Sequence, residues 1–260
     1  MTFDDRMPIS AVLITKNAAN QLADCLASVA FCDEIIVVDS GSEDGTAEIA
    51  ERFGARLIQS DWRGFGLQKQ FAVEQANHDW VLCIDADERV SEHLRENIRK
   101  LFDGEGIPLR ITSSAYRFPR RNRFMGRYLK FGEGYPDWSL RLFDRRNARW
   151  SDDTVHEKVL VSGDIGTLQG DLLHESAESL ETYLAKQNRY STLAAEAALA
   201  CGKRATVMHL LLSPALRFIK FYVFRLGLFD GLPGLVHILV GCGASFAKYA
   251  KMLAFQRDGQ

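Results

Sequence analysis

Short apolar runs alternate with segments of helical spacing through the first third of the chain. The pattern predicts buried strands at the apolar runs 9–15, 34–39, 55–58 and 80–84. Helical spacing at 20–30 and 47–53 predicts helices between them. This alternation is typical of βαβ units and a parallel sheet. We therefore expect an α/β fold with a Rossmann-like, mostly parallel sheet flanked by helices.

Two of the predicted strands end in acidic residues. Asp39 closes the run 34–39, and Asp85-Ala86-Asp87 follows the run 80–84. Because ligands of parallel sheets bind at the carboxyl ends of the strands, both acids are expected along one crevice. Two carboxylates two residues apart suit a hard cation such as Mg²⁺ or Mn²⁺ that also contacts phosphates. A lone D-x-D is more often an ordinary strand end. The acidic end of the run 34–39 therefore strengthens the interpretation of Asp85 and Asp87 as a metal site.

The last sixty residues are apolar and basic. Large apolar residues crowd the stretches 210–229 and 235–246, which a break at 230–234 separates. On a helix, Ser213, Arg217 and Lys220 share one face, which predicts a basic amphipathic helix able to lie in a membrane interface. Neither stretch holds about 20 uninterrupted apolar residues, which disfavours a full span. Helices packed on the rest of the protein or in a dimer interface remain an alternative, as does a transmembrane or re-entrant segment.

Charge is distributed unevenly behind a net charge of −2. Residues 1–109 hold 10 basic and 20 acidic side chains, residues 110–149 hold 11 and 3, and residues 197–260 hold 8 and 2. Basic blocks of this kind favour an anionic partner. The chain carries no recognised nucleic-acid-binding motif, so a phosphorylated lipid or an anionic membrane fits better than nucleic acid.

Cysteine usage and the N-terminus bear on the compartment. The five cysteines are scattered and form no C-x-x-C pair, which predicts reduced thiols and no zinc site. Residues 1–8 are polar and acidic and do not resemble a secretory signal. We therefore expect a cytoplasmic protein.

Three motifs follow one another in the first ninety residues. They are Ile14-Thr15-Lys16-Asn17, the run from Val37-Val38-Asp39 to Gly45-Thr46, and Ile84-Asp85-Ala86-Asp87-Glu88. The series resembles family-2 glycosyltransferases with the GT-A fold. With residues 62–70 and 155–157, it is similar to bacterial transferases that add glucose to the inner core of lipopolysaccharide. The resemblance covers about residues 8 to 255 and implies a GT-A catalytic domain at 1–200 and a helical, membrane-associating region at 201–260.

The resemblance implies a UDP-sugar donor, UDP-glucose first, and assigns residues to its binding. Asp39 is expected to bind the uracil or the ribose, and Thr15 and Asn17 to line the same nucleotide pocket. Lys69 is expected to touch a donor phosphate, with a solvated helix lysine as the alternative. A turn or helix-capping acid is the alternative for Asp39.

The same resemblance implies a divalent metal, Mg²⁺ or Mn²⁺. Asp87 is the first expected ligand, and Asp85 is placed nearer the ribose or at the edge of the metal site. His174 is a candidate third ligand, since imidazole is acceptable to Mn²⁺. Glu88 is given a minor role, pairing with Arg89 or capping a helix.

The expected catalytic base lies later in the chain. Asp137 and Arg141 resemble the acceptor-side acidic motif of inverting family-2 enzymes, although Pro136 replaces the first acid of that motif. Asp137 is therefore the first candidate, with Glu133 and Asp153 as alternatives, and a single displacement with inversion would follow. A structural salt bridge between Asp137 and Arg141 at a helix start is the competing interpretation.

Acceptor binding is assigned to a basic segment and to a His-Glu pair. Arg120, Arg121 and Arg123 are expected to contact acceptor phosphates, because guanidinium binds phosphate bidentately. His156 and Glu157 are expected to orient a sugar. Together these residues predict a phosphorylated lipid A–core acceptor, with transfer to a heptose, at the cytoplasmic face of the inner membrane.

Other functions stay open at this point. A different lipid-linked or cell-envelope acceptor would use the same chemistry. A non-catalytic, membrane-binding protein on a degenerate GT-A fold is the alternative from another class, although the intact Asp39, Asp85 and Asp87 argue against it. A sugar-1-phosphate nucleotidyltransferase would carry a Gly-rich signature after the first strand, which residues 15–20 lack.

Overall fold

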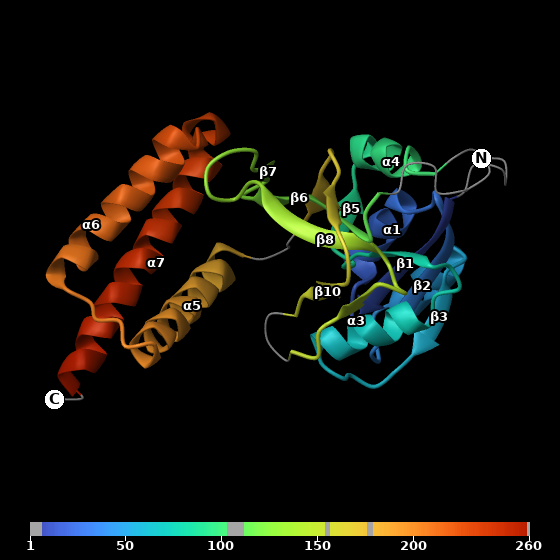
Figure 1. The fold of residues 1–260 in the computed structure, drawn as a ribbon, viewed down its shortest axis with the longest axis horizontal. Coiled ribbons are helices and arrows are strands. Elements are labelled where there is room, and N and C mark those ends of the chain that lie inside the picture. Colours follow the sequence, from blue (N-terminus) through green and yellow to red (C-terminus); the bar gives the residue numbers. More distant parts are fainter. Residues whose placement is uncertain (1–6, 103–111, 154–156, 176–178, 259–260) are drawn as a thin grey trace. The chain divides into compact units, whose positions relative to one another are not determined.

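The chain forms two compact units (Figure 1). The computed structural model describes residues 7–102, 112–153, 157–175 and 179–258. The first unit comprises residues 1–120 and 137–175, and the second comprises residues 121–136 and 176–260. Residues 176–200, which the sequence interpretation grouped with the catalytic domain, lie in the second unit.

Four parallel strands open the first unit, as the apolar runs predict. They pair in the order β3-β2-β1-β4. Their bounds are Met7–Thr15 (β1), Cys32–Asp39 (β2), Arg56–Gln59 (β3) and Trp80–Cys83 (β4). The connecting helices are Ala19–Ser28 (α1), Thr46–Arg52 (α2) and Phe65–Glu74 (α3). The register sets Thr15 beside Asp39, so both predicted donor residues reach the same edge of the sheet.

The rest of the sheet is largely antiparallel, so the expectation of a mostly parallel sheet holds only for β1 to β4. Strand β8 runs antiparallel to both β4 and β6, and β12 runs antiparallel to β5. The full order is β3-β2-β1-β4-β8-β6-β12-β5. The fold is therefore a mixed α/β sheet.

The remaining strands between residues 88 and 174 differ in length. The larger strands are Glu88–Val90 (β5), Ala115–Phe124 (β6), Asp137–Asp144 (β8) and Leu172–His174 (β12). The smaller ones are Arg127–Tyr128 (β7), Ala148–Trp150 (β9), Val159–Val161 (β10) and Ile165–Thr167 (β11). Helix α4 spans Glu92–Arg99, and the Ser91 hydroxyl caps it by accepting the N–H of Leu94.

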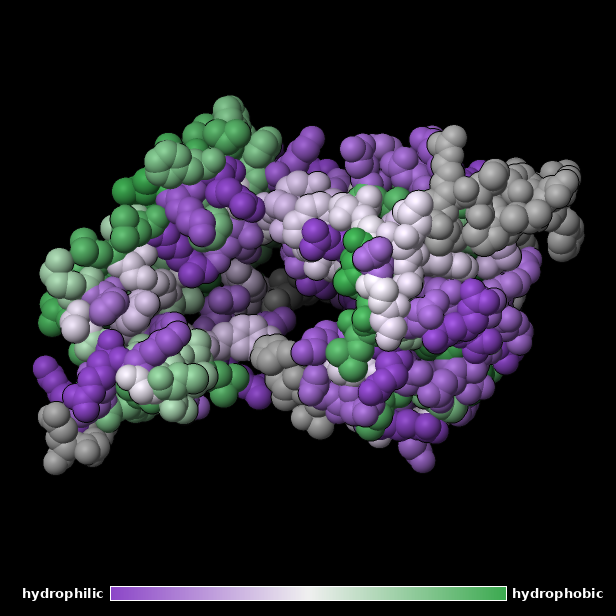
Figure 2. Space-filling view, in the orientation of Figure 1, coloured by the Kyte–Doolittle hydropathy of each residue, from purple (hydrophilic) through white to green (hydrophobic). Residues whose placement is uncertain are grey.

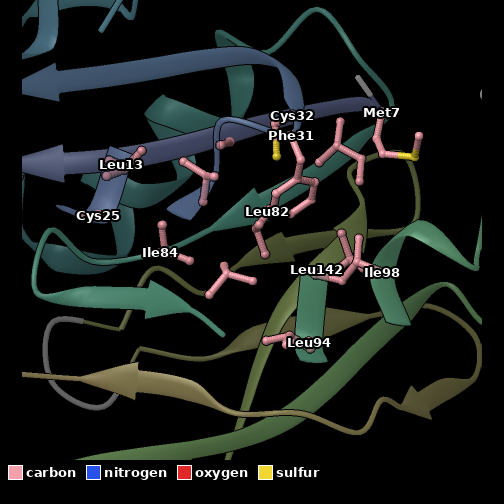
Figure 3. Close-up of a cluster of buried hydrophobic side chains, with 14 of the residues drawn as sticks. Met7, Leu13, Cys25, Phe31, Cys32, Leu82, Ile84, Leu94, Ile98 and Leu142 are labelled. Atoms are coloured by element: carbon pink, nitrogen blue, oxygen red, sulfur yellow. The ribbon is translucent and has the colours of Figure 1, made fainter. Parts of the chain in front are cut away.

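A buried apolar cluster fixes the strands that carry the predicted site (Figure 3). Leu82 of β4 and Leu142 of β8 are fully buried, as are Leu94 and Ile98 of α4. All five cysteines are free thiols, and burial raises the pKa of the Cys83 thiol to about 12. The ends of β4 and β8 therefore project from a rigid core with unreactive thiols.

The second unit is helical. Its elements are Leu180–Ala200 (α5), Val207–Phe218 (α6), the π-helical turn Ile219–Phe224, the 3₁₀ turn Gly227–Asp230 and Gly231–Asp258 (α7). Buried Asp230 holds residues 130–131 against the turn by accepting the N–H groups of Lys130 (3.0 Å) and Phe131 (2.8 Å). The break between the two apolar stretches thus falls at 225–230, and helix resumes at Gly231. Two helical segments, 207–224 and 227–257, are long and apolar enough to cross a bilayer, judged by length and composition alone. The sequence analysis disfavoured a full span because neither apolar stretch is uninterrupted.

Gly66 gives a stability prediction for the first unit. A methyl group at this position would lie 2.3 Å from the carbonyl oxygen of Ser151, a backbone atom that cannot easily move. We expect Gly66→Ala to destabilise the protein by about 1–3 kcal/mol through overpacking. Exposed Gly243, in α7, has nothing near its added methyl, so Gly243→Ala should instead stabilise by up to about 1 kcal/mol. Urea unfolding of both variants measures this, and equal midpoints would contradict the close approach of α3.

Candidate active site

The D-x-D sequence forms a turn between two strands. Strand β4 ends at Cys83, and β5 begins at Glu88. The Glu88 carboxylate accepts the N–H of Asp85 at 3.0 Å, and the Glu88 N–H donates to the Asp85 carbonyl at 2.9 Å. These two bonds close the turn and fix the directions in which the Asp85 and Asp87 side chains point.

Glu88 lies at the centre of the ion pairs of this site, and its partners are Arg141 and Arg120 rather than the expected Arg89. Its side chain is fully buried, and its Oε1 accepts Arg141 Nη2 at 2.9 Å and Arg120 Nη1 at 3.4 Å. Arg89, the partner expected from the sequence, instead contacts Asp24. A buried carboxylate needs such partners, because an unpaired buried charge is very costly.

Asp85 lies between two cations. Arg141 Nη2 contacts its Oδ2 at 2.8 Å, and Lys69 Nζ contacts its Oδ1 at 3.2 Å. Burial alone would raise the pKa of Asp85, but Arg141 and Lys69 outweigh it and hold that pKa well below its usual range. Lys69 also contacts Glu157 at 3.2 Å and lies over the Trp150 ring. Lys69 is therefore a buried member of an ion-pair chain, which excludes the solvated-lysine alternative.

Asp87 and His174 meet because β5 pairs with β12. The register places His174 beside Glu88, and His174 Nε2 lies 3.1 Å from Asp87 Oδ2. The Glu175 N–H also donates to the Asp87 carbonyl, at 2.9 Å. Both side chains remain partly exposed, at 32% for Asp87 and 19% for His174.

This pair fits a divalent metal that takes its other ligands from substrate. A carboxylate oxygen and an imidazole nitrogen are suitable donors for Mn²⁺. Among the described residues, no group of three or more His, Cys, Asp or Glu side chains is placed for a metal. Mg²⁺ is commonly held by one or two carboxylates together with phosphates and water, so two protein ligands suffice. Asp85 is less available for that role because two cations already occupy it.

The predicted donor residues gather at the ends of β1 and β2. Asp39 is fully buried and accepts the Thr15 hydroxyl at 2.9 Å, the Ser42 N–H at 2.8 Å and the Ser42 hydroxyl. Burial alone would raise the pKa of Asp39, but the bonds from Ser42 and Thr15 hold it below its usual range. Asn17 has a positive φ of 53° and accepts the Glu43 N–H at 2.9 Å. Asp39 therefore organises the loop that follows β2, and Ser42 is a member of this network that the sequence reasoning missed.

A cleft of about 380 Å³ opens beside these ion pairs. Its wall carries charged side chains and two tryptophan rings, including Lys69, Asp85, Arg120, Arg141, Trp138 and Trp150. The tryptophans were not singled out as site residues from the sequence, and Arg141 was noted only in its motif with Asp137. Each lies in a strand whose partners are distant in the chain. Glu157 also lines this cleft, as its assignment to sugar binding requires.

Asp137 lies at the start of β8 and pairs with Arg120. Arg120 donates through Nε (2.9 Å) and Nη2 (2.7 Å) to the same Asp137 oxygen, Oδ2. The carboxylate is 40% exposed, and its neighbours Arg120 and Trp138 line the cleft. The alternative pairing with Arg141 is wrong, because residues four apart in a strand are separated by about 13 Å rather than one helical turn.

The other predicted residues that the structure describes are not among those that line the cleft. Glu133 belongs to the second unit, where Arg217 Nε contacts it at 3.0 Å. Arg121 and Arg123 also belong to the second unit, whereas Arg120 belongs to the first, although all three lie in β6. Asp153 is exposed beside β9, and His156 lies outside the described residues.

Comparison with known families decides what kind of protein carries this site. The family described as "Glycosyl transferase family 2" matches residues 10–159. The chain belongs to glycosyltransferase family 2. As a family-2 glycosyltransferase it is an enzyme, and its mixed sheet is GT-A-like. The resemblance inferred from the three motifs is thereby confirmed.

Individual relatives extend over nearly the whole chain. The lipopolysaccharide core biosynthesis glycosyltransferase LpsC of Rhizobium meliloti (strain 1021) is 33% identical, over 95% of this chain and 92% of that protein. An uncharacterized glycosyltransferase of Rickettsia bellii (strain RML369-C) is 31% identical, over 94% and 85%. Among solved structures, Staphylococcus aureus TarS 1–349 in complex with UDP-GlcNAc is 16% identical, over 98% and 93%, with a TM-score of 0.48.

The buried ion pairs of Glu88 with Arg141 and Arg120 give a second prediction. Replacing Glu88 with Gln leaves Arg141 and Arg120 without their shared carboxylate, so we expect a loss of about 3–5 kcal/mol of unfolding free energy. Glu92, whose exposed carboxylate pairs with Arg95, is the matched control, and Glu92→Gln should change stability by at most about 1 kcal/mol. Chemical denaturation compares the two, and similar small losses would show that Glu88 does not hold the site together.

Proposed function

We propose that this protein is an inverting hexosyltransferase that moves glucose from UDP-glucose to a heptose of the lipopolysaccharide inner core, with the aid of a divalent metal. The observation that carries the proposal is the Asp87–His174 pair. Asp87 follows two residues after Asp85, which lines the cleft. The similarity to LpsC supports lipopolysaccharide as the acceptor class. Another lipid-linked or cell-envelope glycan is the alternative acceptor.

Asp87 and His174 would hold the metal. Bound there, Mg²⁺ or Mn²⁺ supplies Lewis-acid neutralisation of the diphosphate leaving group. Lys69 adds a positive charge next to Asp85 on the same cleft wall, where a donor phosphate would be attracted. In this proposal Asp85 keeps Lys69 and Arg141 in place and contacts the ribose, rather than being a principal metal ligand.

The nucleotide would occupy the loop at the ends of β1 and β2. Thr15 and Asn17 line this pocket by the family resemblance, and Asp39 is assigned to the uracil or ribose. Since Asp39 is buried and bonded to Thr15 and Ser42, its main part in this proposal is to position those polar groups. The nucleotide would then contact a loop whose shape is already set.

Asp137 is the proposed base. Arg120 fixes one of its oxygens and thereby orients the other, while the carboxylate remains accessible. The acceptor hydroxyl attacks the anomeric carbon opposite the departing UDP and gives its proton to Asp137 as the sugar–phosphate bond breaks. A single displacement inverts the anomeric configuration. Glu133 and Asp153 are less suitable, because the first is held by Arg217 and the second is an exposed residue that the cleft wall does not include.

The acceptor would lie over the cleft wall that Trp138 and Glu157 share. The Trp138 ring is 47% exposed, with the Arg117 guanidinium 5.2 Å from its centre, and it offers an apolar face for a sugar ring. Arg120, Arg121 and Arg123, with His156, remain the proposed contacts for acceptor phosphates and hydroxyls. This acceptor would be presented at the cytoplasmic face of the inner membrane, where the apolar helices of the second unit associate.

The identity of the base can be tested by a charge-removing substitution. Asp137→Asn should lower kcat by about 10²–10⁴-fold, the usual contribution of general-base catalysis, with an unchanged dissociation constant for UDP. Asp153→Asn tests the alternative base, and Asp164→Asn, at an exposed turn, is the control. Transfer from UDP-glucose to core-truncated lipopolysaccharide is the assay. Loss of turnover in Asp153→Asn but not in Asp137→Asn would reverse the assignment.

One transfer assay tests the donor, the metal and the acceptor, because each can be omitted or replaced in turn. With Mn²⁺, glucose from UDP-glucose should be transferred to lipopolysaccharide that ends in heptose, and chelation by EDTA should abolish transfer until Mn²⁺ is restored. UDP-galactose and UDP-GlcNAc are the donor controls. Full activity in EDTA would contradict the metal assignment, and transfer only to heptose-free glycolipids would contradict the acceptor.

A further inference from the structure

Helix α6 carries an apolar stripe that faces away from the protein. Met208, Leu212 and Leu216 recur every four residues, which places them on one face of α6. Ile219 and Val223 follow in the π-helical turn that continues α6. These five residues are here called the α6 stripe, and each is between 45% and 63% exposed. No residue of α6 is buried. A surface helix of a soluble protein normally turns such a stripe toward its core.

The polar residues Ser213 and Arg217 of α6 pack inward, next to half-buried apolar residues of the same helix. Ser213 Oγ lies 3.1 Å from Ser245 Oγ of α7, and Arg217 binds Glu133. An added methyl at Gly241 of α7 would lie 2.5 Å from Glu133, so a small residue makes room for this ion pair. Figure 2 shows apolar side chains gathered over the outer side of α6. The hairpin of α6 and α7 is therefore inverted on its α6 side, where Ser213 and Arg217 face inward and large apolar side chains are exposed, as in proteins that face lipid.

The charges around the α6 stripe indicate which partner covers it. Exposed cations flank α6, with Lys203 and Arg204 before it and Lys220 and Arg225 after it. A second copy of the chain, related by a twofold axis, would bring these cations against one another along antiparallel stripes, which is repulsive. An anionic membrane instead receives the apolar side chains among its acyl chains and the cations at its headgroups.

The acidic residues near the stripe do not offset these cations. Glu133 is paired with Arg217, and Asp230 accepts main-chain N–H groups inside the unit. The basic segment 121–136, which holds 4 basic and 1 acidic side chains, belongs to the same unit as the hairpin. The outward charge of this unit is thus positive beside a continuous apolar face.

We propose that the α6 stripe is immersed in the acyl-chain layer of one anionic membrane leaflet, with α6 and α7 forming a monotopic hairpin. This goes beyond the proposed surface association, because the hairpin is held by apolar burial that salt does not screen. It is also independent of the acceptor, since the stripe would bind lipid whatever sugar the enzyme transfers.

Vesicle flotation of the full chain tests the proposal. Wild-type protein should float with vesicles of phosphatidylcholine and phosphatidylglycerol and should stay bound in 1 M NaCl, where the screening length is only about 3 Å. The double variant Leu212→Ser/Leu216→Ser should partition at least about tenfold more weakly, because it loses two apolar side chains from the buried face. Leu160→Ser/Ile165→Ser, at two exposed apolar positions of the first unit, is the matched control and should float like wild type. Release of wild type by salt, or unchanged flotation of the stripe variant, would overturn the proposal.

Spin labels at adjacent positions test the orientation without relying on the double variant. In a Cys201→Ser background, which removes the exposed cysteine, Leu212→Cys and Ser213→Cys each carry one nitroxide. On vesicles, the label at 212 should be relaxed by oxygen, which concentrates in acyl chains, and the label at 213 should not. Equal oxygen access at both positions would contradict the inverted hairpin. A stripe that mediates dimerisation of lipid-free protein and does not bind vesicles would contradict it as well.

Discussion

The buried ion pair between Glu88 and Arg141 is the interaction on which the site depends. It joins β5 to β8, two strands that are not neighbours in the sheet. Glu88 also accepts the N–H of Asp85, and Arg141 also contacts the Asp85 carboxylate. Because both side chains are buried, water cannot solvate either charge if its partner is lost. The D-x-D turn is thus held through the main chain of Asp85 by Glu88 and through the side chain of Asp85 by Arg141.

The same pair organises the groups on either side of the turn. Asp85 holds Lys69 in the cleft wall, and Arg120 bridges Glu88 and Asp137. The residues proposed for the donor phosphate and for the base therefore share one chain of charges. Asp87 stands apart from this chain and meets His174 through the β5–β12 pairing. Asp87 and His174 are therefore held by strand pairing, whereas Asp85, Glu88 and Asp137 are paired with cations.

Local chemistry explains what could be predicted from the sequence. The strands β1 to β4 and the acids at their ends follow from apolar runs and turn residues, which act over a few positions. The partners of Glu88 could not be predicted in this way, because Arg141 is 53 residues away and reaches it only through an antiparallel strand that the βαβ pattern did not indicate. Likewise, hydropathy gives the apolar stripe of α6 but not the side that faces α7. That depends on Ser245 and Glu133, which lie on other elements.

Calorimetric titration of UDP, with and without Mn²⁺, tests the central claim most directly. Wild-type protein should bind UDP far more tightly with Mn²⁺, and Asp87→Ala should lose this metal dependence because its carboxylate would hold the metal. Asp164→Asn, which removes an exposed carboxylate away from the cleft, should bind as wild type does. UDP binding that is absent with every metal, or that is equally metal-dependent in Asp87→Ala, would contradict a nucleotide-sugar and metal site at the end of β4.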